Sequence, residues 1–243
     1  MDPRKNSFPI ALTFDDILLL PGYAGFSRSE IDLSARLTKK INLKLPLVSA
    51  PMDTVTESEL AIELAKLGGI GIIKRNLYVV DQVGEVKKVR KLNLLVGAAV
   101  GAGSGFEERV RALVNAGVSV IVVDSAHGFS RQVIDATKTI KKKYPRLQLI
   151  AGNIATADGA KALIDAGADG LRVGMGPGAI CTTRVISGMG VPQVTAVLDT
   201  VKVARKAGIP VIAEWGIKYS GDMVKALALG ASTCMMGNYF AQA

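Results

Sequence analysis

The stretch Asp165-Ala-Gly-Ala-Asp-Gly-Leu-Arg-Val-Gly174 decides the fold. A helix-like segment ends at Gly167, and a short, mainly apolar run begins three residues later. Glycine at such a position adopts the left-handed conformation that ends a helix. A short apolar run without strict alternation is typical of a parallel strand that is covered on both faces. The stretch therefore predicts one helix-to-strand junction of an α/β protein.

The same junction recurs at residues 115–124, 206–214 and 229–237. In total, eight runs with strand character begin near Pro46, Gly69, Leu94, Val120, Leu149, Gly170, Pro210 and Thr233. Segments between them, such as 57–67 and 105–115, have the 3.6-residue period of amphipathic helices. Eight such units in about 200 residues predict a single-domain (β/α)8 TIM barrel over residues 1–243, with an open doubly wound sheet as the alternative. Residues 1–45 are expected to form an N-terminal extension that leads into the barrel.

The composition narrows the classes of partner. The chain has a net charge of +9, 49% hydrophobic residues and 21% charged residues, as expected of a protein with a sizeable core. The basic runs 87–91 and 138–146 lie on helix-like segments without interleaved aromatic residues, so we expect solvated helix faces and no nucleic-acid partner. No apolar stretch is long enough to span a membrane, and the N-terminus lacks an apolar signal core, so no membrane partner and a cytoplasmic location are expected. A small molecule is the expected ligand.

The active sites of such barrels lie at the carboxyl ends of the strands. The residues that follow the predicted strands bring acids, amides, a thiol and a lysine to one rim. These rim segments are Ser49–Asp53, Lys74–Asn76, Asp124–His127, Asn153, Gly174–Thr183, Glu214–Trp215 and Gly237–Tyr239. This set contains no cluster with metal-ligand spacing, so no metal site is predicted.

The richest rim segment reads Gly174-Met-Gly-Pro-Gly-Ala-Ile-Cys-Thr-Thr-Arg184. Its glycines can free several backbone N–H groups to face an anion. Cys181 is a candidate nucleophile, provided that its surroundings favour the thiolate. The alternative is a tight turn with a small, half-buried thiol. The other cysteine, Cys234, lies in an unlike context, so the two are expected to be reduced thiols and not a disulfide.

These rim residues resemble the catalytic core of the IMP dehydrogenase family, with GMP reductase as close kin. The resemblance begins at residues 12–23 and is most specific over residues 46–57, 176–184 and 219–227. It implies that Cys181 attacks the purine C2, that hydride passes to NAD, and that Thr183 assists near the base. It also implies a monovalent cation at the carbonyls of the Cys181 loop. Because the family forms tetramers, a homo-oligomer is possible.

The resemblance assigns the remaining rim residues to two ligands. Asp124 and Asn153 are expected along the nicotinamide ribose, although both can also act as caps of nearby loops. The loop glycines and Gly216 are expected to receive the 5′-phosphate. The cofactor-binding residues are Asp124, Asn153, Gly174 and Gly176. The substrate-binding residues are Ser49, Met52, Ala179, Trp215, Gly216, Gly237, Asn238 and Tyr239.

The chain departs from the family in two segments outside the pocket. Lys91 runs directly into Leu92, where the family carries a regulatory pair of CBS modules, so this insert is absent near residues 91–92. The sequence ends at Ala243, where the family continues into a mobile flap that supplies the base for hydrolysis. By this resemblance, full turnover of the native reaction is expected to be impaired or lost.

Other departures concentrate in the pocket. Ala179 stands where the family has serine, Lys74 where it has histidine, and Tyr239 where it has a small or aliphatic residue. Glu214-Trp215-Gly216 replaces the usual Asp-Gly-Gly, which places an indole where glycine allows close approach of a phosphate. This concentration is typical of a pocket that has been engineered, or otherwise rebuilt, for another ligand, in which case NAD and the cation need not bind.

Four functions remain open. The first is an IMP dehydrogenase-like core that depends on Cys181 and NAD. In the second, Glu214 is a general base, Trp215 stacks on a small aromatic substrate, and Lys74 or Tyr239 donates a hydrogen bond. In the third, Lys74 forms a Schiff base. The alternative to the second and third functions is that Lys74 and Glu214 only form an ion pair with each other. The fourth is an inert scaffold.

Overall fold

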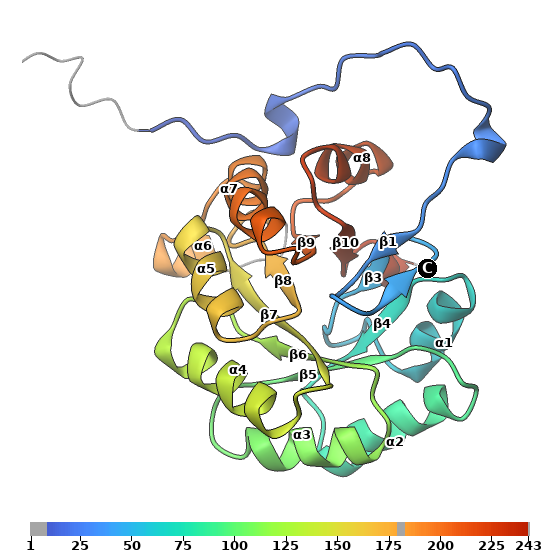
Figure 1. Ribbon diagram of the computed structural model, residues 1–243, viewed down its shortest axis with the longest axis vertical. Helices are drawn as coiled ribbons and strands as arrows, with labels where there is room; N and C mark the ends of the chain where they lie inside the picture. The colour runs from blue at the N-terminus through green and yellow to red at the C-terminus, as the bar shows by residue number, and fades with distance from the viewer. Residues whose placement is uncertain (1–8, 179–182, 243) are drawn as a thin grey trace, which may run out of the picture.

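The computed structural model describes residues 9–178 and 183–242, and its centre is a closed barrel of eight parallel strands. Figure 1 shows the ring of strands inside a layer of helices. Around the ring the strands follow one another as β3 (Leu47–Ser49), β4 (Ile70–Ile73), β5 (Gly97–Val100), β6 (Val120–Asp124), β7 (Gln148–Ile154), β8 (Gly170–Val173), β9 (Val211–Glu214) and β10 (Thr233–Met236). Because β10 pairs with β3, the ring closes. The predicted TIM barrel is confirmed, and the open sheet is wrong.

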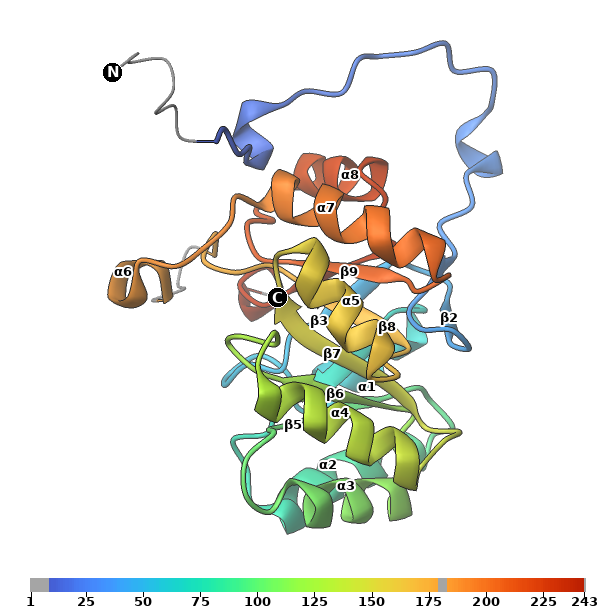
Figure 2. The ribbon, with the colours of Figure 1, turned by 60° about the vertical axis from the view of Figure 1, so that its left-hand side comes forward.

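The helices alternate with the strands and cover the outside of the ring (Figures 1 and 2). They are α1 (Ser58–Lys66), α2 (Val79–Arg90), α3 (Phe106–Asn115), α4 (Arg131–Lys143), α5 (Ala157–Asp165), α6 (Thr183–Ser187), α7 (Gln193–Lys206) and α8 (Ser220–Ala228). Figure 2 shows that the short α6 stands away from the barrel wall, and none of its residues is buried.

Strand alternation decides which side chains reach the barrel interior. On β6, Val120 and Val122 belong to the inner core, whereas Ile121 and Val123 belong to the outer core between strands and helices. Asp124 is the next residue of the inner series. On β8 the outer positions are Leu171 and Val173, so Arg172 points inward. The alternation therefore points the charged side chains of Asp124 and Arg172 into the barrel, at the carboxyl ends of the strands.

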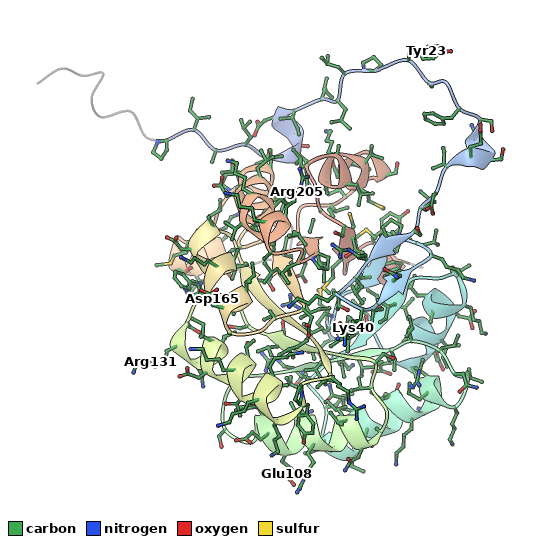
Figure 3. All side chains as sticks on the ribbon, in the orientation of Figure 1. Tyr23, Lys40, Glu108, Arg131, Asp165 and Arg205 are labelled. Carbon is green, nitrogen blue, oxygen red and sulfur yellow. The ribbon has the colours of Figure 1, made fainter. Side chains whose placement is uncertain are left out.

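The N-terminal segment passes around the barrel before it closes the opposite end. Residues 9–34 form an extension that runs outside the helices, and Figure 3 labels Tyr23 on it. The start of the extension contacts α7: the amide of Leu12 donates to Thr195 Oγ1 at 2.9 Å. Phe14, two residues later, is buried. The following hairpin, β1 (Ala35–Arg36) and β2 (Asn42–Leu43), brings Leu37 into the inner core at the amino ends of the strands.

One of the two basic runs is only partly solvated. Lys141 of α4 is mostly buried, and its Nζ lies 2.7 Å from Asp169 Oδ2 and 2.8 Å from the carbonyl oxygen of Leu147. The expectation of a wholly solvated face is therefore wrong for Lys141. Within the described residues, no helix is long and apolar enough to cross a bilayer.

Close packing between α1 and β4 leads to a stability prediction. A Cβ atom at Gly71 would lie 2.6 Å from Ala61 Cβ and 2.7 Å from Ala61 Cα, so Gly71→Ala must push α1 away from the barrel. We expect a loss of about 1–3 kcal/mol in the free energy of unfolding. Urea denaturation with matched m-values measures this loss.

Gly84→Ala is the matched control, because Gly84 lies inside α2 and its added Cβ meets no atom within 4 Å. Alanine there should stabilise the helix by about 0.5–1 kcal/mol. Equal effects of the two substitutions would contradict the packing described for α1.

Candidate active site

A buried ion-pair network occupies the carboxyl-end mouth of the barrel. Arg172 of β8 is 3% exposed, and its Nε lies 2.9 Å from Glu214 Oε2 of β9. Its Nη2 bonds to Asp124 Oδ1 of β6. The other carboxylate oxygen of Asp124 accepts from Arg75 Nε at 2.9 Å. One buried guanidinium therefore serves two carboxylates, only one of which has a second cation.

Amide side chains fix the geometry of this network. Asn153 of β7 donates from Nδ2 to Glu214 Oε2 at 2.7 Å and to the carbonyl of Gly174 at 2.8 Å, and its Oδ1 accepts from Arg172 Nε. Gln193, at the start of α7, donates to the carbonyls of Val173 and Glu214 at 3.0 and 2.8 Å. The ends of β7, β8 and β9 are therefore tied together by side chains.

The shared cation separates the two carboxyl groups electrostatically. Burial raises the pKa of Glu214 above its ordinary value, although Arg172 and the hydrogen bond from Asn153 oppose this. Burial also disfavours the charge on Asp124, but Arg172 and Arg75 outweigh it and hold the pKa of Asp124 below its ordinary value. Burial works against the charge on Arg172 too, yet Glu214 and Asp124 raise its pKa, so it stays cationic. The mouth therefore holds one firmly ionised acid and one more basic carboxylate.

The indole of Trp215 packs on the glycine-rich loop. A Cβ at Gly178 would lie 2.0 Å from Trp215 Cε3, and a Cβ at Gly174 would lie 2.9 Å from Trp215 Cδ1. Glycine at both positions therefore makes room for the ring. Trp215 itself has φ of 77°, a left-handed conformation that costs a bulky residue about 1–2 kcal/mol. The backbone conformation at position 215 is therefore one that favours glycine over a bulky residue.

Trp215 lines two cavities at the mouth. The first, of about 240 Å³, is lined by Asp124, Ser125, Ala126, Asn153, Arg172, Gly174, Met175, Gly176, Thr183 and Trp215. The second, of about 60 Å³, is lined by Met52, Gly178, Glu214, Trp215, Gly216, Ile217, Lys218, Met235, Met236, Gly237 and Asn238. Polar and apolar groups line both cavities. The charged side chains are those of Asp124 and Arg172 in the first and those of Glu214 and Lys218 in the second.

Most predicted site residues are brought together by these two cavities. The first gathers Asp124, Asn153, Gly174, Gly176 and Thr183. The second gathers Met52, Glu214, Gly216, Gly237 and Asn238. The predicted nucleophile Cys181 and the predicted phosphate-side residue Ala179 lie outside the described residues.

Three predicted residues do not line either cavity. Ser49 is fully buried, and its Oγ accepts from Thr56 Oγ1 at 2.9 Å. Tyr239 is half exposed and meets the ring of Phe240 edge-on, with centroids 5.8 Å apart. The third is Lys74.

The alternative of an ion pair between Lys74 and Glu214 is wrong. The Nζ of Lys74 lies 2.7 Å from Glu57 Oε1, just before α1, whereas Glu214 pairs with Arg172. Neither Lys74 nor Tyr239 is therefore in place to donate a hydrogen bond beside Glu214; Lys218 and Asn238 line that cavity instead.

Sequence reasoning missed Arg172, Arg75 and Gln193 as organising residues. The available signal was the charge inside Gly170-Leu-Arg-Val173, since a charged side chain in a strand that is buried on both faces requires a buried partner. The second cysteine is not a competing nucleophile, because burial raises the pKa of the Cys234 thiol to about 12. Across residues 9–178 and 183–242, no three His, Cys, Asp or Glu side chains form a group that could hold a metal ion.

Comparison with known proteins identifies what the chain is similar to. The sequence profile of the "IMP dehydrogenase / GMP reductase domain" family matches residues 11–243. Three relatives carry the name inosine-5′-monophosphate dehydrogenase. The protein of Cryptosporidium parvum is 44% identical over 273 residues, with 95% of this chain and 68% of the relative covered. That of Borreliella burgdorferi is 43% identical over 281 residues (95% and 70%), and that of Aquifex aeolicus is 37% identical over 358 residues (95% and 73%).

The ion-pair network predicts a pH-dependent loss of stability. Arg172→Met leaves Asp124 and Glu214 buried without their shared cation, so we expect a loss of about 3–5 kcal/mol at pH 7. Without the cation, the pKa values of both acids rise in the folded state. The folded variant then binds more protons than the unfolded chain as the pH falls, so the loss becomes smaller at pH 5. Urea denaturation at the two pH values measures both effects.

Arg75→Met is the control, because Arg75 pairs with the same Asp124 but is half exposed. Its loss should be at most about 1 kcal/mol. If both variants lose the same stability, or if the loss in Arg172→Met does not change with pH, the shared-cation description is incorrect.

The contact between Trp215 and Gly178 predicts a fluorescence change. Since the chain has a single tryptophan, its emission reports this contact alone. Gly178→Ala should displace the indole, shift its emission to longer wavelength and increase quenching by acrylamide. Gly221→Ala, whose Cβ meets no atom within 4 Å, should leave both unchanged. An unchanged spectrum in Gly178→Ala would contradict the packing.

Proposed function

The chain belongs to the IMP dehydrogenase / GMP reductase domain family, and from this membership we propose that its barrel is a purine-nucleotide oxidoreductase core whose native turnover is impaired by Trp215. The observation that carries the proposal is the larger cavity at the mouth. It combines the carboxylate of Asp124, the amide of Asn153 and the hydroxyl-bearing Thr183 with the backbone of Gly174 and Gly176. Its lining includes described residues that precede and follow Cys181 in the sequence, namely Gly174, Met175, Gly176 and Thr183.

The residues of this cavity fit a nicotinamide group. The Nη1 of Arg172 is buried and has no hydrogen-bond partner among the described residues, and Arg172 lines the same cavity. A buried N–H group without an acceptor is costly. Because this nitrogen is closed to water, a carboxamide oxygen would reach it only after side chains at the mouth move. Asp124 and Asn153 would then lie beside the attached ribose. NAD, when bound, would accept the hydride that leaves the substrate.

Cys181 would provide the nucleophile of this reaction. Its sulfur would bond to C2 of the purine while the hydrogen at C2 departs as hydride, and water would hydrolyse the resulting thioimidate. Thr183, which lines the cavity, would assist near the base. Carbonyls of the Cys181 loop would hold a monovalent cation. These roles rest on the family resemblance of residues 176–184.

Trp215 is the reason to expect impaired turnover. The family has glycine at this position, where the ribose phosphate approaches the backbone of Gly216. Here the smaller cavity, which includes Gly216, Gly237 and Asn238, measures about 60 Å³. Since one water needs about 10–15 Å³, it has room for about four to six waters. A ribose 5′-phosphate is larger than this, so the indole would have to move before a nucleotide could bind.

Amine catalysis at Lys74 has less support. Its ammonium group is held 2.7 Å from Glu57 Oε1 and away from both cavities. An ammonium group in an ion pair has no lone pair with which to attack a carbonyl.

A second copy of the chain is the expected partner. The N-terminal extension exposes several large apolar side chains, among them Leu18, Leu20 and Tyr23. Figure 3 labels Tyr23 on this extension. Contiguous exposed apolar groups of this kind are typical of a protein–protein contact. We infer a homo-oligomer in which this extension contacts a neighbouring barrel.

Removal of the indole tests the proposal. Trp215→Gly opens the space beside Gly216 and suits the left-handed backbone, so we expect IMP to bind at least about tenfold more tightly, equivalent to about 1.4 kcal/mol. Equilibrium dialysis with labelled IMP measures the affinity, and absorbance of NADH reports hydride transfer.

Tyr78→Gly serves as the control. Tyr78 is an exposed aromatic residue that lines neither cavity, so its removal should not change IMP binding. If Trp215→Gly binds no IMP, the nucleotide proposal fails and the inert-scaffold alternative gains support.

A further inference from the structure

The carboxylate of Glu214 is held by one oxygen only. Its Oε2 lies 2.7 Å from Asn153 Nδ2 and 2.9 Å from Arg172 Nε. Among the described residues, no donor contacts Oε1, although the side chain is 5% exposed and lines the smaller cavity. Glu214 is therefore oriented by fixed partners on one side and has a second oxygen that can accept a proton on the other.

The walls of this cavity suit a small flat ligand. The indole of Trp215 forms one wall, and Met52, Met235 and Met236 supply apolar, polarizable contacts. At about 60 Å³, the cavity accommodates one edge of a planar ring, with the rest of the ring at its solvent side. Lys218 and Asn238 line the same cavity and are exposed, so they can donate hydrogen bonds at its solvent side.

From this arrangement we propose a further activity: Glu214 Oε1 removes a proton from carbon in a small planar heteroaromatic substrate that stacks on Trp215. Removal of the proton breaks a bond to an oxygen atom of the substrate, and Lys218 or Asn238 stabilises the negative charge that develops on this oxygen. This activity requires neither Cys181 nor NAD, so it does not depend on the nucleotide proposal.

The surroundings of Glu214 agree with the role of a base. Burial raises the pKa of this carboxyl above its ordinary value, which makes the carboxylate a stronger base than one in water. Arg172 of β8 opposes the shift, and Asp124 of β6 adds to it. Lys218 is a further charged group that lines the same cavity, at its solvent side. Arg172, at ion-pair distance, favours the ionised form of Glu214 and so opposes the effect of burial.

A benzisoxazole is the probe for this chemistry, and 5-nitro-1,2-benzisoxazole gives a coloured product. Glu214 Oε1 forms a bond to the proton at C3, and the C–H electron pair becomes the second π bond of a nitrile. The N–O bond breaks, and its electron pair goes to the oxygen, which leaves as a phenolate. The protonated Glu214 then returns its proton to water. No oxidant, reductant or further reactant is consumed.

The test compares the rate of phenolate release by the full chain and by Glu214→Gln. We expect kcat/KM to fall at least about 100-fold in the variant. In the unsubstituted chain, kcat/KM should rise with pH until Glu214 is ionised, with a midpoint above that of an ordinary glutamate. In Glu214→Gln this rise should disappear.

Glu57→Gln is the matched control, because Glu57 is another carboxylate near the mouth but lies outside the cavity and pairs with Lys74. Its kcat/KM should stay within about twofold of the unsubstituted chain. Glu214→Asp is a second variant that separates loss of the base from loss of folding, because it keeps a negative charge to pair with Arg172. It should fold, as judged by urea denaturation, and should lose at least about tenfold because its carboxylate is withdrawn from the cavity. Equal kcat/KM in the unsubstituted chain, Glu214→Gln and Glu214→Asp would overturn the proposal.

Discussion

The interaction on which the mouth of this barrel depends is the sharing of one buried guanidinium between two carboxylates. Arg172 lies between Asp124 and Glu214, with Asn153 bridging the same groups. The closed ring makes this possible, because consecutive strands β6 to β9 place their inward side chains next to one another. A buried guanidinium is stable only when its partners are supplied from several directions, and here strands β6, β7 and β9 supply them.

This network gives chemically similar groups different properties. Asp124 pairs with Arg75 as well as Arg172 and remains ionised. Glu214 is more deeply buried, and Arg172, which also pairs with Asp124, is its one cationic partner among the described residues. Trp215 follows Glu214 directly and carries its indole over Gly178, so the backbone that positions the carboxylate also positions the aromatic wall. The left-handed φ of Trp215 is held by this packing, as is typical of strained residues at functional sites.

The fold was predictable because its signals are local and repeated. The junctions before Val120, Gly170 and Thr233 predict strand starts where the structure has them. The mouth residues were predictable as a set, because parallel strands end on one side. Their pairing was not: the sequence cannot tell that Glu57, and not Glu214, reaches Lys74. The outward direction of Ser49 follows from strand alternation only once Val48 is known to face the inner core.

The shared cation is tested most directly by carbon-13 NMR of the side-chain carboxyl groups during a pH titration. The account predicts that the Glu214 carboxyl titrates above the ordinary range for glutamate and that the Asp124 carboxyl titrates below the ordinary range for aspartate. If the Asp124 carboxyl titrated at or above its ordinary value, Arg172 would not be holding it ionised, and the description of the mouth would be contradicted.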